Sequence, residues 1–397
     1  MLRIKDTRYP NTASFLKSAV CIAEYYGFRP FEEAPRMDPA GMRQLRQRAG
    51  KNEAEPALAR KEERLLVAAA RRCAFFARAP GGSLLLWRTA SDLKSAMPHV
   101  SLELHVLGTN SAVAEALLIV VANSIAEEAG LRERTLSVNN IGSAESSTRY
   151  VRDVASYLRK HIESISPTLR PRAALDPLGT LVALIERGHP AVPRAPQPME
   201  YLTEEERRRF WDLLEYLEVF GLPYELSPHV LGSRDCWSHS LYQISARDPE
   251  SGSPMSIAFG GRYDPLASRF AAAPAAAAMI SITSEVRGRA RPKRETPGIP
   301  SIYFAHLGVE ARRRSLGLLE KLRAAGIPVH HGLCHERIGE QMAEARRHAV
   351  PYVLIMGHKE AVEGTILVRE VATNSQDAIT LPELPGYLKR RRLLAVA

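Results

Sequence analysis

The sequence predicts an α+β fold in two parts: an antiparallel sheet with flanking helices over residues 1–288, and an α/β domain from residue 300 onward. Three observations predict this fold. The chain has 397 residues, which is too long for one ordinary domain. Residues 101–107 alternate polar and apolar side chains, and short runs at 241–244 and 255–258 flank a turn, as in a hairpin. After residue 300, apolar runs alternate with amphipathic helical patterns, which is typical of an α/β domain.

The elements of the first part follow from helix caps, turn residues and apolar periodicity. Apolar residues recur at helical spacing over residues 14–26, and Gly27 ends this helix. Thr203 and Glu206 predict a capping box at the start of a helix that Gly221 ends. The other predicted elements are strands at 28–32, 84–88, 101–107, 136–139, 241–244, 255–258 and 278–282, and helical regions at 41–79, 112–128 and 146–165.

The second part begins after a basic segment, residues 287–300, that contains three prolines and two glycines. We expect a linker at 289–299 and a separate domain over 300–397. Within the first domain, residues 146–200 predict a helical insertion. The predicted strands of a mainly parallel C-terminal sheet are 302–305, 328–330 and 352–356, and its predicted helices are 310–325 and 338–348. The more polar run 365–368 predicts an edge strand.

The composition narrows the classes of function. The formal net charge is +10, which favours an acidic partner such as nucleic acid, although an arginine-rich solvated surface explains the charge equally well. None of the four cysteines belongs to a Cys-x-x-Cys pair, so we expect no metal site and a reducing compartment. The N-terminus has no apolar signal core, and the longest apolar run, 112–122, is too short to span a bilayer. We therefore expect a cytoplasmic protein.

Several sequence motifs, taken in order, resemble class II histidyl-tRNA synthetases over almost the whole chain. The most specific is FGGRYDPL at residues 259–266, which is similar to the family's glycine-rich GGGRYDGL. Residues 220–225 resemble its LGIPYE, and residues 235–244 resemble its histidine-recognition hairpin, RGLDYYTGTVFE. Further similarities, to motif 1, the end of motif 2, two short turns and the anticodon-binding domain, lie at residues 26–35, 103–108, 138–142, 176–178 and 326–388.

This resemblance implies an amino-acid pocket between the strand at 103–105, the hairpin at 235–242 and the paired glycines, where the backbone can approach a ligand closely. The substrate-binding residues that it implies are Glu103, His105, Asp235, Trp237, Tyr242, Gly260, Gly261, Arg262 and Tyr263. In this family, arginines of motifs 2 and 3 hold ATP through bidentate contacts. Arg88 and Arg287 are the corresponding candidates here, and Arg88 and Arg234 are the catalytic candidates.

The chain departs from the family pattern at residues that perform chemistry. Ala90 stands where motif 2 has glutamate, and residues 279–287 lack both glycines of the motif 3 sequence GFALGLER. Leu231 takes the place of the hairpin arginine, unless Arg234 substitutes for it after a slip of one residue. Each lost contact to a charged group costs roughly 1.5–3 kcal/mol. Three such losses would slow activation by roughly three to six orders of magnitude.

These departures favour a histidyl-tRNA synthetase-like protein with a degenerate ATP and histidine site and a tRNA-binding or regulatory role. The alternatives are a divergent active histidine–tRNA ligase, a histidine-sensing subunit of the ATP phosphoribosyltransferase type, and a fold reused to aminoacylate another acceptor. ATP and Mg²⁺ are expected cofactors only if the protein is active. The expected partners are tRNA, a small amino-acid ligand and, because residues 28–35 resemble the dimer-forming motif 1, a second copy of the chain. A membrane partner is not expected.

Overall fold

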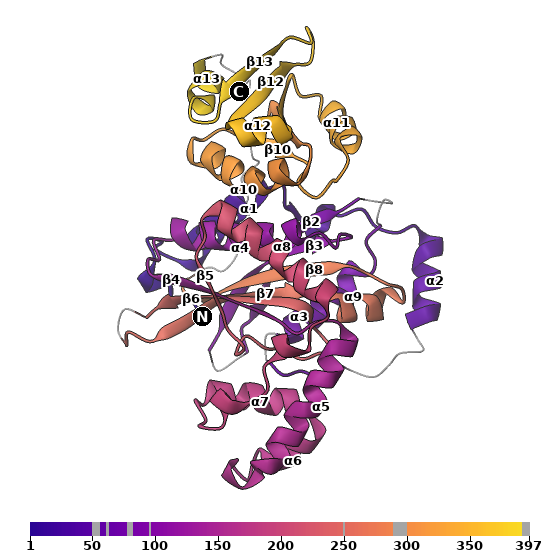
Figure 1. The fold of residues 1–397 in the computed structure, drawn as a ribbon, viewed down its shortest axis with the longest axis vertical. Helices are drawn as coiled ribbons and strands as arrows, with labels where there is room; N and C mark the ends of the chain where they lie inside the picture. The colour runs from indigo at the N-terminus through magenta and orange to yellow at the C-terminus, as the bar shows by residue number, and fades with distance from the viewer. Residues whose placement is uncertain are drawn as a thin grey trace.

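The chain forms two β-sheets, each covered by helices (Figure 1). A computed structural model describes residues 1–49, 56–60, 63–77, 82–94, 97–248, 251–288 and 300–390. The eight-stranded sheet is built from the first 288 residues, and the five-stranded sheet from residues after 300. The α+β fold class predicted from the sequence is confirmed. The predicted linker at 289–299 lies outside the described residues.

The larger sheet is almost entirely antiparallel. Its strands are β1 (Arg29–Pro30), β2 (Leu84–Asp92), β3 (His99–Leu107), β4 (Arg134–Asn140), β5 (Tyr224–Leu226), β6 (Ser238–Arg247), β7 (Pro254–Arg262) and β8 (Ala277–Glu285). Their order is β1-β2-β3-β8-β7-β6-β4-β5, and only the outermost pairs, β1 with β2 and β4 with β5, are parallel. The register places Arg88 opposite Glu103, and Glu103 opposite Ser281. Side chains two residues apart along these strands share a face. The register and this alternation together determine which of the predicted site residues can contact each other.

Helices cover both faces of this sheet. One face packs against α1 (Thr12–Tyr25), α4 (Ala112–Glu128) and α8 (Glu204–Phe220), drawn above the sheet in Figure 1. On the other side lie α3 (Glu63–Cys73) and α9 (Asp264–Ala271), while α5 (Ala144–Lys160) and α7 (Pro177–Glu186) pack against each other and are drawn below the sheet in Figure 1. The remaining helices of this part are α2 (Pro39–Ala49) and α6 (Arg170–Leu175). The predicted capping box at Thr203 and the left-handed Gly221 at the end of α8 are confirmed.

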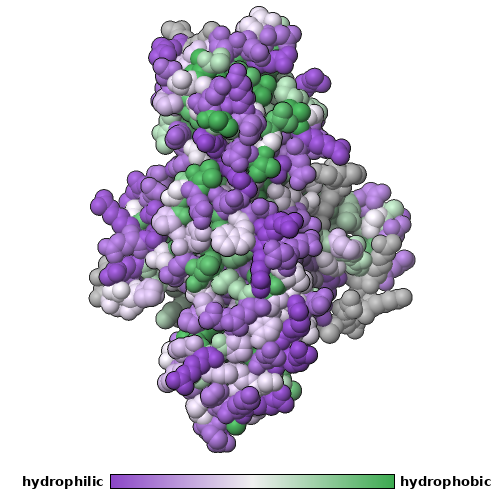
Figure 2. Space-filling model, in the orientation of Figure 1, coloured by the Kyte–Doolittle hydropathy of each residue, from purple (hydrophilic) through white to green (hydrophobic). Residues whose placement is uncertain are grey.

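Helix α4 is buried on every side, because it is apolar around its whole circumference. It lies between the sheet and the helices α1 and α8. Nevertheless, none of the helices in the described parts of the chain combines the length and the apolar character that crossing a bilayer requires. The face of the molecule shown in Figure 2 is mostly hydrophilic, with hydrophobic side chains in small separate groups.

The C-terminal sheet is mixed. Its strands are β9 (Ile302–His306), β10 (His330–His331), β11 (Tyr352–Met356), β12 (Thr365–Glu370) and β13 (Gln376–Thr380), in the order β10-β9-β11-β12-β13. Its helices are α10 (Val309–Ala324), α11 (Ile338–Arg347), α12 (His358–Glu363) and α13 (Leu384–Arg390).

Two sequence predictions about this sheet are wrong. Strands β9, β10 and β11 are parallel, but β11, β12 and β13 are antiparallel, so the sheet is not mainly parallel. Residues 365–368 lie in an internal strand, and β13 forms the edge. The sequence of β13, Gln-Asp-Ala-Ile-Thr, is polar and mostly exposed, so it lacks the apolar pattern from which a strand is predicted.

The two parts of the chain pack firmly against each other. The Tyr25 hydroxyl, at the end of α1, lies within hydrogen-bond distance of the carbonyl oxygens of Leu319 (3.1 Å) and Ile327 (3.0 Å) in the C-terminal part, and its single proton is shared between them. The Tyr26 hydroxyl donates to the Glu320 carboxylate on α10. Helix α10 also packs against α4 and α8, and one hydrophobic core extends through both parts.

Candidate functional site

Four of the predicted site residues meet on the sheet face that α3 and α9 cover. Arg88 Nε donates to Glu103 Oε2 at 2.6 Å, across the pairing of β2 with β3. His105 lies two residues beyond Glu103 and on the same face, with its Nε2 3.3 Å from the same carboxylate oxygen. Its Nδ1 lies 2.9 Å from the hydroxyl of Tyr263, which directly follows β7. The side chains therefore form one continuous polar chain.

Burial and charge determine which atoms of these hydrogen-bonded side chains carry protons. Burial lowers the pKa of His105, so its ring is neutral near pH 7 and has one donor and one acceptor nitrogen. The Glu103 carboxylate faces Nε2, so Nε2 carries the proton and Nδ1 accepts from the Tyr263 hydroxyl. Burial acts to raise the pKa of Glu103, but the hydrogen bond from His105 and the charge of Arg88 hold it below its usual value. Each group satisfies its neighbour, and nothing in the arrangement requires a ligand.

The Arg88 guanidinium is directed into the protein. Besides Glu103, it donates to the carbonyl oxygen of Leu65 at 2.8 Å, and it lies 5.8 Å from the ring centre of Phe31. Only 10% of its side chain is exposed. An arginine that clamps a phosphate must turn its parallel N–H groups toward open space. To do so here, Arg88 would have to leave the buried Glu103 carboxylate with only the neutral ring of His105 as a partner among the described residues.

The close packing of neighbouring strands explains the paired glycines. A Cβ atom at Gly260 would lie 2.2 Å from the carbonyl oxygen of Met279 and 2.7 Å from the Cα of Ile280, both on β8. At Gly261 it would lie 2.6 Å from the carbonyl oxygen of Ser240 on β6. Any side chain would collide with backbone at either position. The sheet itself therefore requires both glycines, with or without a ligand.

Arg262 is completely buried and lies at the centre of a second polar network. Its guanidinium donates to both carboxylate oxygens of Asp264 (3.0 and 2.9 Å) and to Asn110 Oδ1 (2.9 Å). It also contacts the Glu115 carboxylate at 3.4 Å. Glu115 in turn accepts from Arg209 at 3.3 Å and from the Ser240 hydroxyl. This network ties β7 to the start of α4.

The other predicted site residues lie elsewhere. Tyr242 is on the opposite face of the sheet, in the core with α4, where its hydroxyl donates to the carbonyl oxygen of Met279 at 3.0 Å. Arg234 is exposed and donates to the Thr148 hydroxyl on α5 at 3.1 Å. Asp235 accepts a backbone hydrogen bond from Ala57 at 2.9 Å. Arg287 is exposed beyond the end of β8 and so lies far along the strand from Arg262. The candidates therefore do not converge on one pocket.

Sequence reasoning missed Glu63, which binds the predicted substrate residue Trp237. The Trp237 indole N–H donates to Glu63 Oε1 at 2.9 Å, and the Ser233 backbone N–H donates to the same oxygen at 2.8 Å. The Trp237 ring packs edge-on against Phe259, with ring centres 5.5 Å apart. The Arg60 guanidinium lies 4.5 Å from the centre of that same Phe259 ring. The chain's own side chains therefore fill the space between the hairpin and the sheet.

The signal for Glu63 in the sequence is weak, because a glutamate in the first turn of a helix is common on dipole grounds alone. Burial raises the pKa of Glu63, while hydrogen bonds from Ser233, Arg60 and Trp237 act against that rise. Only the folded hairpin brings Trp237 to the start of α3, so no local pattern could have paired these two residues.

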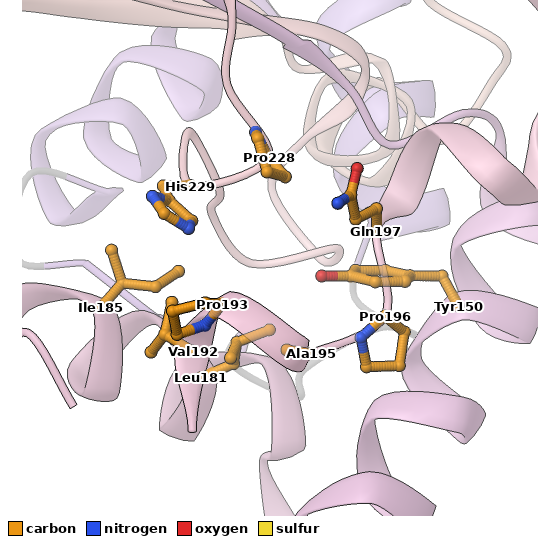
Figure 3. A pocket seen from close by; sticks show the side chains of 10 residues that line it. All are labelled: Tyr150, Leu181, Ile185, Val192, Pro193, Ala195, Pro196, Gln197, Pro228 and His229. Atoms are coloured by element: carbon orange, nitrogen blue, oxygen red, sulfur yellow. The ribbon is translucent and has the colours of Figure 1, made fainter. Parts of the chain in front are cut away.

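Two hollows in the described part of the molecule lie away from these residues. The first, of about 30 Å³, is lined by Tyr150, Leu181, Val192, Gln197 and His229, among others (Figure 3). The Tyr150 hydroxyl points into it and has no hydrogen-bond partner. That volume admits a water molecule but not an amino acid. The second, of about 460 Å³, lies in the C-terminal part. None of the predicted site residues lines either hollow.

Comparison with known proteins found similar sequences and one similar domain. The anticodon binding domain family matches residues 303–391. A histidine–tRNA ligase of Thermosynechococcus vestitus is 28% identical over 298 residues, which cover 74% of this chain and 68% of the ligase. One from Synechococcus elongatus is 28% identical over 317 residues, 77% of this chain and 72% of the ligase. The apo histidyl-tRNA synthetase structure from S. aureus aligns at 16% identity and a TM-score of 0.48, covering 95% of each chain. The sequence relatives, the matched domain and the order of the motifs together show that the chain is similar to histidine–tRNA ligases.

Proposed function

We propose that this histidyl-tRNA synthetase-like protein does not activate histidine, and that it acts by binding tRNA. One observation carries the proposal: two residues that would hold substrates, Arg88 and Trp237, are already bound to buried carboxylates of the chain itself. Arg88 is paired with buried Glu103, and Trp237 donates its indole N–H to Glu63. Opening either contact would remove one hydrogen bond from a buried carboxylate, which costs about 1–3 kcal/mol.

The C-terminal domain and the net charge support the choice of tRNA as partner. Residues 303–391 match a family described as an anticodon binding domain. The net charge of +10 favours association with the phosphate backbone. The firm contact of Tyr25 and Tyr26 with the C-terminal part would present both domains to one tRNA as a rigid surface. A regulatory role on a partner enzyme is the second form of the same proposal, because it too requires no histidine activation.

We expect no histidine-dependent exchange between ATP and pyrophosphate. The rate should be at least about three orders of magnitude below that of a histidine–tRNA ligase assayed in parallel, because the departures from the family motifs would remove three charge-assisted contacts. The measurement is incorporation of labelled pyrophosphate into ATP, with and without histidine. Exchange at a ligase-like rate that disappears on Arg88→Ala or Arg262→Lys would overturn the proposal and establish the divergent active ligase.

Binding of tRNA is measured separately, by fluorescence anisotropy of a labelled tRNA at several salt concentrations. We expect an affinity that falls steeply with salt, as backbone contacts require. Failure to bind tRNA at 50 mM salt, with no exchange activity, would remove the tRNA role and leave the regulatory one.

We also propose a homodimer, because residues 28–35 resemble motif 1 and β1 is a two-residue strand at an open edge of the sheet. Light scattering at micromolar concentration should give about twice the chain mass of 43.9 kDa. A single 44 kDa species at that concentration would contradict this prediction. A fourfold dilution should leave the mass unchanged if the interface is of the size typical of stable dimers.

A further inference from the structure

The hollow of about 460 Å³ lies at one end of the C-terminal sheet, between α11, the start of β11 and the turn from β12 to β13. Its apolar floor is formed by Met342, Ala345, Val350 and Val353. These residues belong to a small hydrophobic core between α11 and the sheet, which is distinct from the core under α10 and α13. The groove therefore borders that small core, whose residues Ala345, Val350 and Val353 stay buried beneath it. Its volume is in the range of sites that take a small ligand or an anchoring side chain.

The charge of the groove has one sign. Arg346 and Arg369 line it, and none of the other residues that line it is acidic. Arg369 donates one hydrogen bond, to Asn374 at 2.7 Å, and a guanidinium has five N–H donors in all. Arg346 lies on the exposed side of α11. Carboxylates and phosphates are the groups that arginine side chains bind most strongly, so an acidic protein segment and a nucleic acid both suit the charge of the groove.

The side chains on the floor of the groove favour an acidic protein segment over a nucleic acid. Single-stranded nucleic acid is held largely by stacking of its bases on aromatic side chains. No phenylalanine, tyrosine, tryptophan or histidine is among the residues that line the groove. Aliphatic side chains around a concave floor instead suit one large apolar side chain of a protein partner, the usual anchor of a peptide in a pocket.

The backbone at the rim is conformationally unusual. Ala349 has φ 50° and Asn374 has φ 57°, so both are left-handed, and both line the groove. Asparagine adopts the left-handed conformation readily. Directly after a helix this conformation is usual for glycine, but it strains an alanine. The methyl group of Ala349 is thus held on the wall of the groove at a cost in stability. Strain of this kind tends to gather at binding sites.

We propose that this groove docks an acidic segment of a partner protein. One large apolar side chain of the segment enters between α11 and the β12–β13 turn, and flanking carboxylates bind Arg346 and Arg369. The proposal does not depend on tRNA binding, since it concerns a different ligand and names different residues.

The probe is a labelled synthetic peptide with a leucine–phenylalanine pair between two glutamates on each side, titrated against the full-length protein by fluorescence anisotropy. Two further probes are the same peptide with lysines for glutamates and a single-stranded RNA hexamer. We expect the acidic peptide to bind at least tenfold more tightly than the lysine peptide, and we expect unlabelled RNA not to displace it from the groove. Equal affinities for the two peptides, or no binding of the acidic peptide at millimolar concentration, would overturn the proposal. Tighter binding of the RNA at the same groove would assign the groove to nucleic acid instead.

Variants locate the binding. Arg346→Glu combined with Arg369→Glu should weaken the acidic peptide at least tenfold. Ala372→Trp, at an exposed position that lines the groove, should block it. The matched control is Arg159→Glu together with Arg152→Glu, two exposed arginines on α5 that undergo the same change of charge, and it should change the affinity less than twofold. An equal loss in the control would show that the peptide responds to net charge alone and would refute the groove.

Discussion

Replacing Arg262 by methionine should lower the free energy of unfolding by about 3–5 kcal/mol, the range for removing one partner of a buried ion pair. Methionine keeps much of the apolar volume but supplies no N–H groups. The carboxylates of Glu115 and Asp264, 2% and 22% exposed, would then lose their shared cation. The measurement is urea unfolding, followed by the change in its midpoint at constant slope.

Arg209→Met is the control, because Arg209 also contacts Glu115 but is partly exposed, so its loss should cost less than about 1 kcal/mol. Adding Glu115→Gln to Arg262→Met should restore part of the loss, which is the signature of a coupled pair. If Arg262→Met does not fold, Arg262→Lys supplies a milder test. A methionine variant of wild-type stability would show that the network is not structural, and would return Arg262 to the substrate role that the family resemblance implies.

Acidification from pH 7 to pH 5 should destabilise the protein strongly, before carboxylates begin to titrate. Burial lowers the pKa of His306 and His331 in the C-terminal part to about 4. In the unfolded chain these histidines take up protons near pH 6.5. The unfolded state therefore binds more protons between about pH 6.5 and 4, and the free energy of unfolding falls as the pH drops through that window. The two residues together account for a loss of roughly 3–4 kcal/mol between pH 7 and 5.

Other histidines modify this response. Burial also lowers the pKa of His239 and of His330 to about 4, which adds to the loss. His335 acts in the opposite direction, because its hydrogen bond to Glu344 raises its pKa and so stabilises the folded state at the acid end of the window. The measurement is the urea midpoint at half-unit steps from pH 7.5 to pH 4.5.

His306→Phe should reduce the slope of the free energy of unfolding against pH by an amount that corresponds to at most one proton, because it removes one buried titrating ring. The control is His358→Gln, at an exposed position on α12, which should leave the slope unchanged. A profile that is flat from pH 7 to pH 5 in the wild-type protein would refute the prediction. So would an equal effect of the two substitutions.

Motifs that are recognisable in the sequence contain residues whose contacts in the structure are structural. The FGGRYDPL segment is found at a strand end, as its resemblance implies, but Gly260 and Gly261 are already required by contacts with β8 and β6. Tyr242 belongs to the same hairpin as Trp237, yet the alternation of the strand places it on the opposite face of the sheet. A bulge between Ser238 and Leu241, with His239 at φ 53°, shifts the register within the hairpin. Such a shift has no sequence signature as clear as a capping box.

The sequence by itself determined the elements whose causes are local. The capping box at Thr203, the end of α8 at Gly221 and the apolar strands β9 and β11 depend only on neighbouring residues, so a short window of sequence contains their cause. The pairing of Trp237 with Glu63, the burial of Arg88 against Glu103 and the edge position of β13 were decided only by the tertiary structure. Each joins segments that are separated in the sequence or depends on strand order, and a buried polar group is stable only beside the partner that the whole fold brings to it.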